Sequence, residues 1–416
     1  MDFGLIGKNI AYSYSPEIHQ MFNHRDYKIV SLKETELADF LGKRDFQGIN
    51  VTIPYKERVI PYLDFLDGTV IKTGAVNTIT NTNGFLKGYN TDYLSFYQLL
   101  QKNKINLIDK KCLVLGSGAT SKTVCAVLKD LGVLDIAVAS RSPHGDMIAY
   151  QSLNRQSYDI IINATPVGTF PDYNKEPLDL GNFKQTEVVI DFVYNPLRTK
   201  LIQKAVKMKM LAINGLELLV TQAYFARQLW DNCLYEETLI TKIVHKIYQD
   251  KLNIVLIGMP YSGKSSIAIA LGEKLGKQVV DIDNVIEQKT KQKIAAIFSE
   301  IREEGFREFE KQVIKEMNCH GCVIATGGGS ILDEDNMAKL SSEGFIVYIQ
   351  RNKDKITIKD STRPLFKTIA DWEKIASQRE LLYPKYADVV IDNNQLLEEA
   401  VLEISEKYWQ YIKREK

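Results

Sequence analysis

The sequence lacks the features that mark secreted and membrane proteins. It has only five cysteines in 416 residues, an odd number, which argues against a disulfide framework. No apolar run is long enough to cross a bilayer, and no basic and apolar leader marks a signal peptide. The net charge is +1, so no bulk field favours nucleic acid or an anionic membrane. We therefore expect a cytoplasmic protein that acts on small molecules, with its state as monomer or homo-oligomer left open.

One C-x-x-C occurs, at residues 319–322. Such a pair can belong to a redox or zinc site, but a structural zinc site needs further ligands at fixed spacing and the sequence has no second pair. We interpret Cys319 and Cys322 as small residues at the entry of a buried strand over 322–325.

Apolar runs alternate with helical patterns along most of the chain, which predicts an α/β protein with parallel sheets. The length favours more than one domain. We divide the chain into residues 1–104, 105–250 and 251–416. The first block contains a hairpin with an Asn-Gly turn at 83–84, and the third begins with an apolar strand followed by a glycine-rich loop.

That loop is a phosphate-binding motif. Residues 258–265 read GMPYSGKS and fit G-x-x-x-x-G-K-[ST] between a strand and a helix. Backbone N–H groups and the helix N-terminus would surround the phosphates, Lys264 would reach the β- and γ-phosphates, and Ser265 would bind Mg²⁺. The sequence therefore predicts an ATP- and Mg²⁺-dependent phosphotransferase. The expected nucleotide-binding residues are Gly258, Ser262, Gly263, Lys264, Ser265 and Ser266.

Polar residues further along the third block predict where the phosphoryl acceptor binds. Asp281 and Asp283 end the next strand, so both carboxylates would point the same way. One can support Mg²⁺, which we assign to Asp281, and the other can deprotonate a hydroxyl. Arg307, in the run GFREFE, offers a fork for a carboxylate, and the glycines at 327–329 let backbone approach a small polar ligand.

Taken in order, these motifs resemble the shikimate kinase family from residue 253 to about 411. The matching set is the phosphate loop, the two aspartates, G-F-R-x-x-E, T-G-G-G, R-P-L at 363–365, and the stretch 379–383. The resemblance implies that Asp283 is catalytic and that Arg363 lies on a lid and reaches the transferring phosphoryl group. The residues it implies for shikimate are Asp283, Arg307, Gly328, Gly329 and Arg379. The lid region, 351–362, looks short and has lysines where relatives carry a further arginine.

The second block begins with a partial dinucleotide motif. Residues 114–121 read VLGSGATS, a strand, a glycine turn and a helix start, with Ser121 in place of the last glycine of G-x-G-x-x-G. Arg141 follows the next strand, where NAD sites usually carry an acid. An arginine there suits the 2′-phosphate of NADP, although a surface arginine in a loop is the alternative.

The first block offers residues for proton transfer. Lys56 ends the run NVTIPYK at 50–56, and Asp92 follows the hairpin. Alone, such residues are usually solvated, but in a cleft Asp92 would hold Lys56 while Lys56 moves a proton together with a hydride transfer. Ser13 and Ser15 precede Pro16, which would otherwise indicate only a helix start.

These stretches resemble shikimate dehydrogenase from about residue 3 to 249, through S-x-S-P-x-I-H, N-V-T-x-P-x-K, A-V-N-T, N-T-D, I-N-A-T-P-x-G and N-G…Q. The resemblance implies that Lys56 and Asp92 carry catalysis. The residues it implies for shikimate are Ser13, Ser15, Thr52, Lys56, Asn77, Asp92, Tyr194 and Gln222. The residues expected at the NADP site are Gly116, Ser117, Gly118, Ala119, Thr120, Arg141 and Gly215. Many relatives have a glycine where this chain has Ala119.

We therefore expect a two-lobed dehydrogenase with a Rossmann-like NADP lobe, followed by a P-loop kinase domain with a parallel sheet. It would reduce 3-dehydroshikimate with NADPH and phosphorylate shikimate with ATP. One alternative is a quinate/shikimate dehydrogenase that uses NAD. Another is a non-catalytic sensor on the same folds, which the residues expected to carry the chemistry argue against: Lys56, Asp92, Lys264, Ser265 and Asp283.

Overall fold

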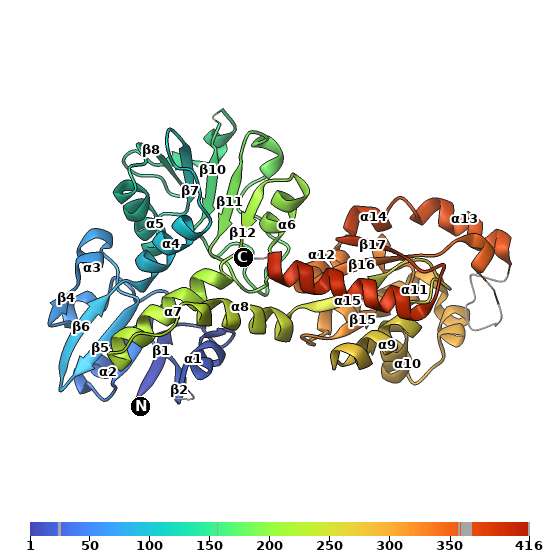
Figure 1. Ribbon diagram of the computed structural model, residues 1–416, viewed down its shortest axis with the longest axis horizontal. Coiled ribbons are helices and arrows are strands. Elements are labelled where there is room, and N and C mark those ends of the chain that lie inside the picture. The colour runs from blue at the N-terminus through green and yellow to red at the C-terminus, as the bar shows by residue number, and fades with distance from the viewer. Residues whose placement is uncertain (24–25, 156, 357, 359–367, 415–416) are drawn as a thin grey trace. The chain divides into compact units, whose positions relative to one another are not determined.

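The computed structural model describes residues 1–23, 26–155, 157–356, 358 and 368–414. The chain forms two compact units (Figure 1). Among the described residues, the N-terminal unit contains 1–195 and 201–244, and the C-terminal unit contains 196–200 and 245–414. No helix in the described residues is both long enough and apolar enough to span a bilayer.

The first lobe of the N-terminal unit is a mixed sheet of order β2-β1-β3-β5-β6-β4. Between β5 and β6, Asn83 and Gly84 both have positive φ, of 53° and 86°, as a two-residue hairpin turn requires. This hairpin returns the chain antiparallel to β3, so the segments after β3 and after β6 meet at one place. The elements are β1 (Phe3–Gly7), α1 (Ser15–Asn23), β2 (Tyr27–Ser31), α2 (Leu37–Lys43), β3 (Gly48–Val51), β4 (Phe65–Leu66), α3 (Gly68–Thr73), β5 (Thr78–Thr82), β6 (Phe85–Tyr89) and α4 (Thr91–Lys102).

The second lobe is a parallel sheet of order β12-β11-β10-β7-β8-β9. The order reverses at β7, and such a switch point leaves a crevice at the carboxyl ends of the central strands. The helix α7 returns to the first lobe and packs along α4 and α1. The elements are β7 (Lys111–Leu115), α5 (Ala119–Asp130), β8 (Asp135–Ser140), β9 (Ile148–Ala149), β10 (Ile160–Asn163), β11 (Val188–Asp191), α6 (Lys200–Lys207), β12 (Leu211–Ile213), α7 (Leu216–Asp231) and α8 (Thr238–Lys251).

The C-terminal unit is built on a parallel sheet of order β14-β15-β13-β16-β17, with buried apolar side chains packed on it. The predicted α/β class with parallel sheets is therefore confirmed. The elements are β13 (Asn253–Ile257), α9 (Lys264–Leu275), β14 (Val279–Asp281), α10 (Ile282–Thr290), α11 (Ile294–Glu316), β15 (Val323–Ala325), α12 (Glu334–Glu343), β16 (Gly344–Gln350), α13 (Ile369–Arg379), α14 (Tyr383–Tyr386), β17 (Val389–Asp392) and α15 (Leu397–Arg414).

One local feature of this unit differs from the sequence expectation, and a second was not expected from the sequence at all. Asp283 does not lie on the strand with Asp281 but in the first turn of α10. The reason is that the Asp281 carboxylate accepts a hydrogen bond from Asn284 N and starts the helix at Ile282. In addition, α11 is interrupted at Arg302, whose φ of 61° and ψ of −172° are not helical.

The C-x-x-C segment leads into β15. Cys322 is buried and its backbone N–H donates to Asn253 Oδ1, while Asn253 Nδ2 donates to Cys319 O. Within the described ranges, no group of three His, Cys, Asp or Glu side chains is placed to hold a metal ion.

Candidate active sites

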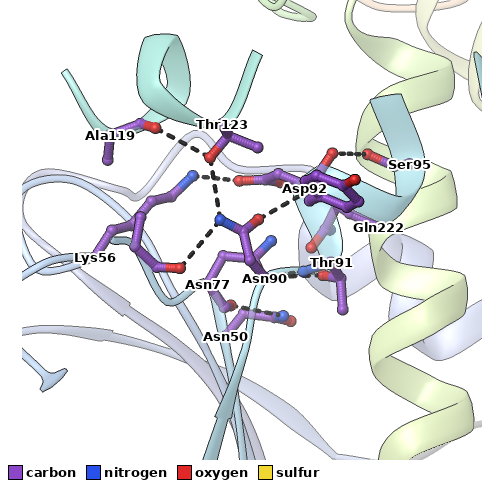
Figure 2. Close-up of polar contacts among 12 residues, drawn as sticks. Asn50, Lys56, Asn77, Asn90, Thr91, Asp92, Ser95, Ala119, Thr123 and Gln222 are labelled. Carbon is purple, nitrogen blue, oxygen red and sulfur yellow. Dashed lines mark hydrogen bonds and ion pairs between the residues drawn. The ribbon is translucent and has the colours of Figure 1, made fainter. Parts of the chain in front are cut away.

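A partly buried ion pair joins Lys56 and Asp92 in the N-terminal unit (Figure 2). Lys56 Nζ and Asp92 Oδ2 are 2.6 Å apart, and their side chains are 14% and 17% exposed. Lys56 comes from the turn after β3, and Asp92 from the first turn of α4. Asn90 begins that helix, since its side chain accepts a hydrogen bond from Tyr93 N and so fixes the position of Asp92.

The ion pair opens into a cavity of about 330 Å³. The structure brings together here all the side chains expected at the dehydrogenase substrate site, although they come from six separate stretches of sequence. The expected residues that line the cavity are Ser13, Ser15, Thr52, Lys56, Asn77, Asp92, Tyr194 and Gln222, and Asn50 lines it as well.

The orientation of the Asn77 carboxamide is fixed by its neighbours. Its Oδ1 accepts hydrogen bonds from Thr91 N at 2.7 Å and from Thr91 Oγ1 at 3.1 Å. Figure 2 shows these groups side by side. The carbonyl end thus faces donors of the protein, and the NH₂ end is the one left for a ligand in the cavity.

Three hydroxyl groups also line the cavity. Ser13 Oγ donates to Ser15 Oγ at 3.0 Å, and Tyr194 OH donates to Ser13 Oγ at 3.4 Å. Burial raises the pKa of Tyr194, so its phenol stays protonated at neutral pH. Three hydroxyls of this kind suit a polar or carboxylate-bearing ligand.

A second cavity, of about 790 Å³, adjoins the first at the carboxyl end of β7. Gly116 has φ of 106°, and a Cβ there would lie 2.9 Å from the Thr165 side chain, so only glycine fits. The N-terminus of α5 starts at Ala119 and faces this cavity, as a pyrophosphate requires. The predicted residues that line it are Gly116, Ser117, Gly118, Ala119, Thr120 and Arg141, with Arg141 exposed.

Two residues are placed in ways that the sequence did not indicate. Gly215 lines the substrate cavity instead of the dinucleotide cavity. Arg58, which pairs with Glu34, lines the dinucleotide cavity from the first lobe. Both cavities also share Lys56, so the ion pair lies where the two ligands would meet.

The phosphate loop of the C-terminal unit borders a cavity of about 390 Å³. Gly258 and Gly263 have φ of 150° and 94°, which the tight loop between β13 and α9 requires. Lys264 Nζ donates to the carbonyl oxygens of Gly258 at 2.8 Å and Met259 at 2.9 Å. The predicted residues that line this cavity are Gly263, Lys264, Ser265, Ser266, Asp281, Asp283 and Gly328, while Gly258 and Ser262 do not line it. Arg351 and Lys355, which were not assigned from the sequence, line it too.

The pair expected to hold Mg²⁺ is in place. Ser265 Oγ donates to Asp281 Oδ2 at 2.8 Å, so a hydroxyl and a carboxylate oxygen lie next to each other at the loop. Oxygen ligands of this kind, completed by phosphate and water, suit Mg²⁺.

Two arginines surround the glycine stretch after β15. Arg307 is held by Glu310 at 2.8 Å and by Glu303 at 2.9 Å, and a Cβ at Gly329 would lie 2.1 Å from its guanidinium. Arg379 donates to Gly328 O at 3.3 Å. Burial acts to lower the pKa of both arginines, but for Arg307 the two glutamates outweigh it and raise the pKa. Glu303 and Glu310 balance the charge of the two arginines, but the guanidinium N–H groups gathered at one small site can bind a carboxylate. The expected catalytic Arg363 lies outside the described residues.

Comparisons with known proteins identify both units. A family model described as the shikimate dehydrogenase substrate binding domain matches residues 5–79, and one described as shikimate kinase matches residues 260–409. A Clostridium botulinum protein (strain 657 / Type Ba4) named shikimate dehydrogenase (NADP(+)) is 40% identical over 245 residues, covering 55% of this chain and 95% of the relative. The chain belongs to the shikimate dehydrogenase family and carries a shikimate kinase domain.

Solved structures of the dehydrogenase family agree. Shikimate dehydrogenase 1 of Peptoclostridium difficile has a TM-score of 0.57 and 30% identity, over 59% of this chain and 98% of that one. The Thermus thermophilus enzyme, solved in complex with NADP(H) and shikimate, has a TM-score of 0.52 and 27% identity, over 58% of this chain and 98% of that one. The prediction of a dehydrogenase joined to a kinase is therefore confirmed, and we call the two parts the dehydrogenase unit and the kinase unit.

Proposed function

We propose that the dehydrogenase unit reduces 3-dehydroshikimate to shikimate with NADPH, and that the kinase unit converts shikimate to shikimate 3-phosphate with ATP. The observation that carries the first activity is the Lys56–Asp92 pair at 2.6 Å, because it stands where the substrate cavity and the dinucleotide cavity share a wall. The product of the first reaction is the substrate of the second.

In the dehydrogenase unit, bound NADPH supplies the hydride for the ketone carbon. The Lys56 ammonium would hydrogen-bond the ketone oxygen and give it a proton, which yields the alcohol and NADP⁺. Asp92 would hold Lys56 in place through their ion pair. The Asn77 NH₂ group and the Ser13 and Ser15 hydroxyls would orient the substrate.

In the kinase unit, Asp283 would accept the proton of the attacking shikimate hydroxyl, and Lys264 would balance charge on the β- and γ-phosphates. Ser265 and Asp281 would hold Mg²⁺. The site would clamp the shikimate carboxylate with the two arginines at the glycine stretch, Arg307 and Arg379. Arg363 would approach the transferring phosphoryl group from the lid.

The finer assignments are also proposals. We infer that the protein acts in the cytoplasm on these small molecules and without nucleic acid, as a monomer or a homo-oligomer. The division into residues 1–104, 105–250 and 251–416 stays a prediction.

One mixture tests both activities. The full chain is incubated with 3-dehydroshikimate, NADPH and MgATP, and shikimate 3-phosphate is measured by mass spectrometry while NADPH absorbance is followed. The Lys264→Ala variant should form shikimate but no shikimate 3-phosphate. The Lys56→Ala variant should form shikimate 3-phosphate only when shikimate itself is added. Loss of both activities in either folded variant would contradict two separate sites. Repeating the assay with NADH tests the NAD alternative.

A further inference from the structure

We infer that Tyr27 is a positioning residue of the dehydrogenase site, whose hydroxyl fixes the Asn50 carboxamide and, through Thr78, the Asn77 carboxamide. This role rests on the proposed function, since it concerns how the same cavity holds shikimate. Tyr27 itself does not line the cavity.

Tyr27 is the first residue of β2 and reaches across β1 to β3. Both Tyr27 and Gly48 pair with Phe3, and Asn50 pairs with Leu5, so one strand separates the phenol from Asn50. Its hydroxyl donates to Asn50 Oδ1 at 2.7 Å, and both side chains are buried. A hydrogen bond of this kind inside the lobe is stronger than one exposed to water.

The rest of the Asn50 carboxamide faces β5. Asn50 Nδ2 donates to Asn77 O at 3.2 Å and to Thr78 Oγ1 at 3.1 Å. The backbone oxygen of Asn77 can only accept a hydrogen bond. If the Asn50 carboxamide were flipped, its Oδ1 would therefore lie against another carbonyl oxygen. The Tyr27 hydroxyl satisfies the opposite end, so the whole amide has one orientation.

The chain of hydrogen bonds ends at the cavity. Thr78 Oγ1, which accepts from Asn50, can donate to Asn77 Oδ1 at 3.1 Å, and it lies 3.0 Å from Thr91 Oγ1. Asn77 Oδ1 is thereby held from three sides, by Thr78 and by the N–H and hydroxyl of Thr91. Tyr27 thus stabilises, from the edge strand β2, the arrangement that presents the Asn77 NH₂ group to the substrate.

The Tyr27 ring is itself fixed by packing. It stacks on His19 with centroids 4.1 Å apart and an interplanar angle of 9°, and it belongs to a small buried cluster with Phe3 and Leu5. Burial raises the pKa of Tyr27 well above its ordinary value, so the hydroxyl remains a donor throughout the pH range of the assay.

The test compares Tyr27→Phe with Tyr55→Phe in the full chain. Tyr55 is a matched control because it is fully buried in the same lobe and its hydroxyl donates to Leu32 O at 2.6 Å, outside this chain of hydrogen bonds. In the direction shikimate plus NADP⁺, Tyr27→Phe should raise the KM for shikimate about tenfold, the size expected for one buried hydrogen bond, and change kcat less than about twofold. Tyr55→Phe should lower the melting temperature without raising that KM.

The KM for NADP⁺ and the kinase constants serve as internal checks, because they depend on the other lobe and the other unit. An unchanged shikimate KM in Tyr27→Phe, or an equal rise in both variants, overturns the role. A fall in kcat at constant KM also overturns it, since it would place Tyr27 in the chemical step. A wild-type chain without dehydrogenase activity overturns the proposed function itself, and with it this role.

Discussion

Lys56 Nζ lies 2.6 Å from Asp92 Oδ2 although 36 residues separate them in the chain. The β5–β6 hairpin brings the chain back to the end of β3, and the Asn90 cap starts α4 at that place. The reaction centre is therefore set by the sheet and by one helix start, not by a contiguous motif.

Replacing Lys56 by alanine should remove the proton donor and leave the rest of the cavity in place. We expect kcat/KM of the dehydrogenase to fall by about 10³ or more, the range for losing a general acid, while shikimate phosphorylation is unchanged. Lys87→Ala, on β6 and outside both cavities, is the control. Near-normal NADPH oxidation by Lys56→Ala would remove Lys56 from the mechanism.

Arg141 should discriminate between the two dinucleotides. Because its guanidinium can pair with a phosphate that only NADP carries, Arg141→Ala should weaken NADPH binding by roughly tenfold or more and NADH binding little. Titration of each cofactor into the variant, with the exposed Lys129→Ala of α5 as control, measures this difference. Equal losses for both cofactors would show that the 2′-phosphate is recognised elsewhere.

Arg302 holds a backbone conformation that suits glycine. With φ of 61° and ψ of −172° inside α11, a side chain there is strained by about 1–3 kcal/mol. Arg302→Gly should therefore raise the free energy of unfolding of the kinase unit by about 1 kcal/mol, after the entropy of the unfolded glycine is subtracted.

The measurement is urea unfolding in a Trp230→Phe background, which leaves Trp372 and Trp409 as reporters of the kinase unit. Arg302→Ala is the matched control, because it removes the charge and keeps the Cβ. If alanine stabilises as much as glycine, the gain comes from the lost charge and the strain explanation is wrong.

His19 should make the dehydrogenase unit sensitive to mild acid. Burial, and then the charge of Arg227, lower the pKa of His19 to about 3, against 6.5 in the unfolded chain. Between pH 6.5 and pH 3 the unfolded chain binds a proton at His19 and the folded chain does not. The contribution of neutral His19 to the free energy of unfolding is therefore complete above pH 6.5 and is lost as the pH falls towards 3. From pH 7 to pH 5 the loss should be about 2 kcal/mol.

Urea unfolding at pH 7 and at pH 5 measures this loss. The background carries Trp372→Phe and Trp409→Phe, so the fluorescence of Trp230 alone follows the unfolding of the dehydrogenase unit. The Trp230 ring lies 5.2 Å from that of His19. His19→Phe should lose about 2 kcal/mol less stability between pH 7 and pH 5 than the parent chain. Equal losses in the two proteins would show that His19 takes up a proton in the folded state as well.

The sequence was most informative where a short motif carries its own backbone geometry. The phosphate loop, the glycine turn after β7 and the Asn83-Gly84 hairpin each need left-handed glycines at fixed positions, so their elements could be predicted closely. The placement of Asp283 could not, because helix α10 starts at Ile282, directly after its cap Asp281, instead of the strand continuing.

Contacts between distant segments were also beyond the sequence. Arg58 lines the dinucleotide cavity from the other lobe, and Tyr27 reaches Asn50 across a strand. Neither residue type nor spacing marks such a contact, since it depends on which strands become neighbours. The unusual backbone conformation of Arg302 could not be predicted from the sequence either, because the sequence has an arginine at a position where the backbone favours glycine.

Asn90 has a mechanical consequence for the cleft. Its Nδ2 donates to Thr73 Oγ1 and Ala75 O in the first lobe and to Thr123 Oγ1 in the second, all at 2.9–3.0 Å. These hydrogen bonds tie the two lobes together two residues before Asp92, beside the Lys56–Asp92 pair. The side chain that starts α4 therefore also acts as a clamp between the lobes, so the alignment of the proton donor and the contact between the lobes depend on the same residue.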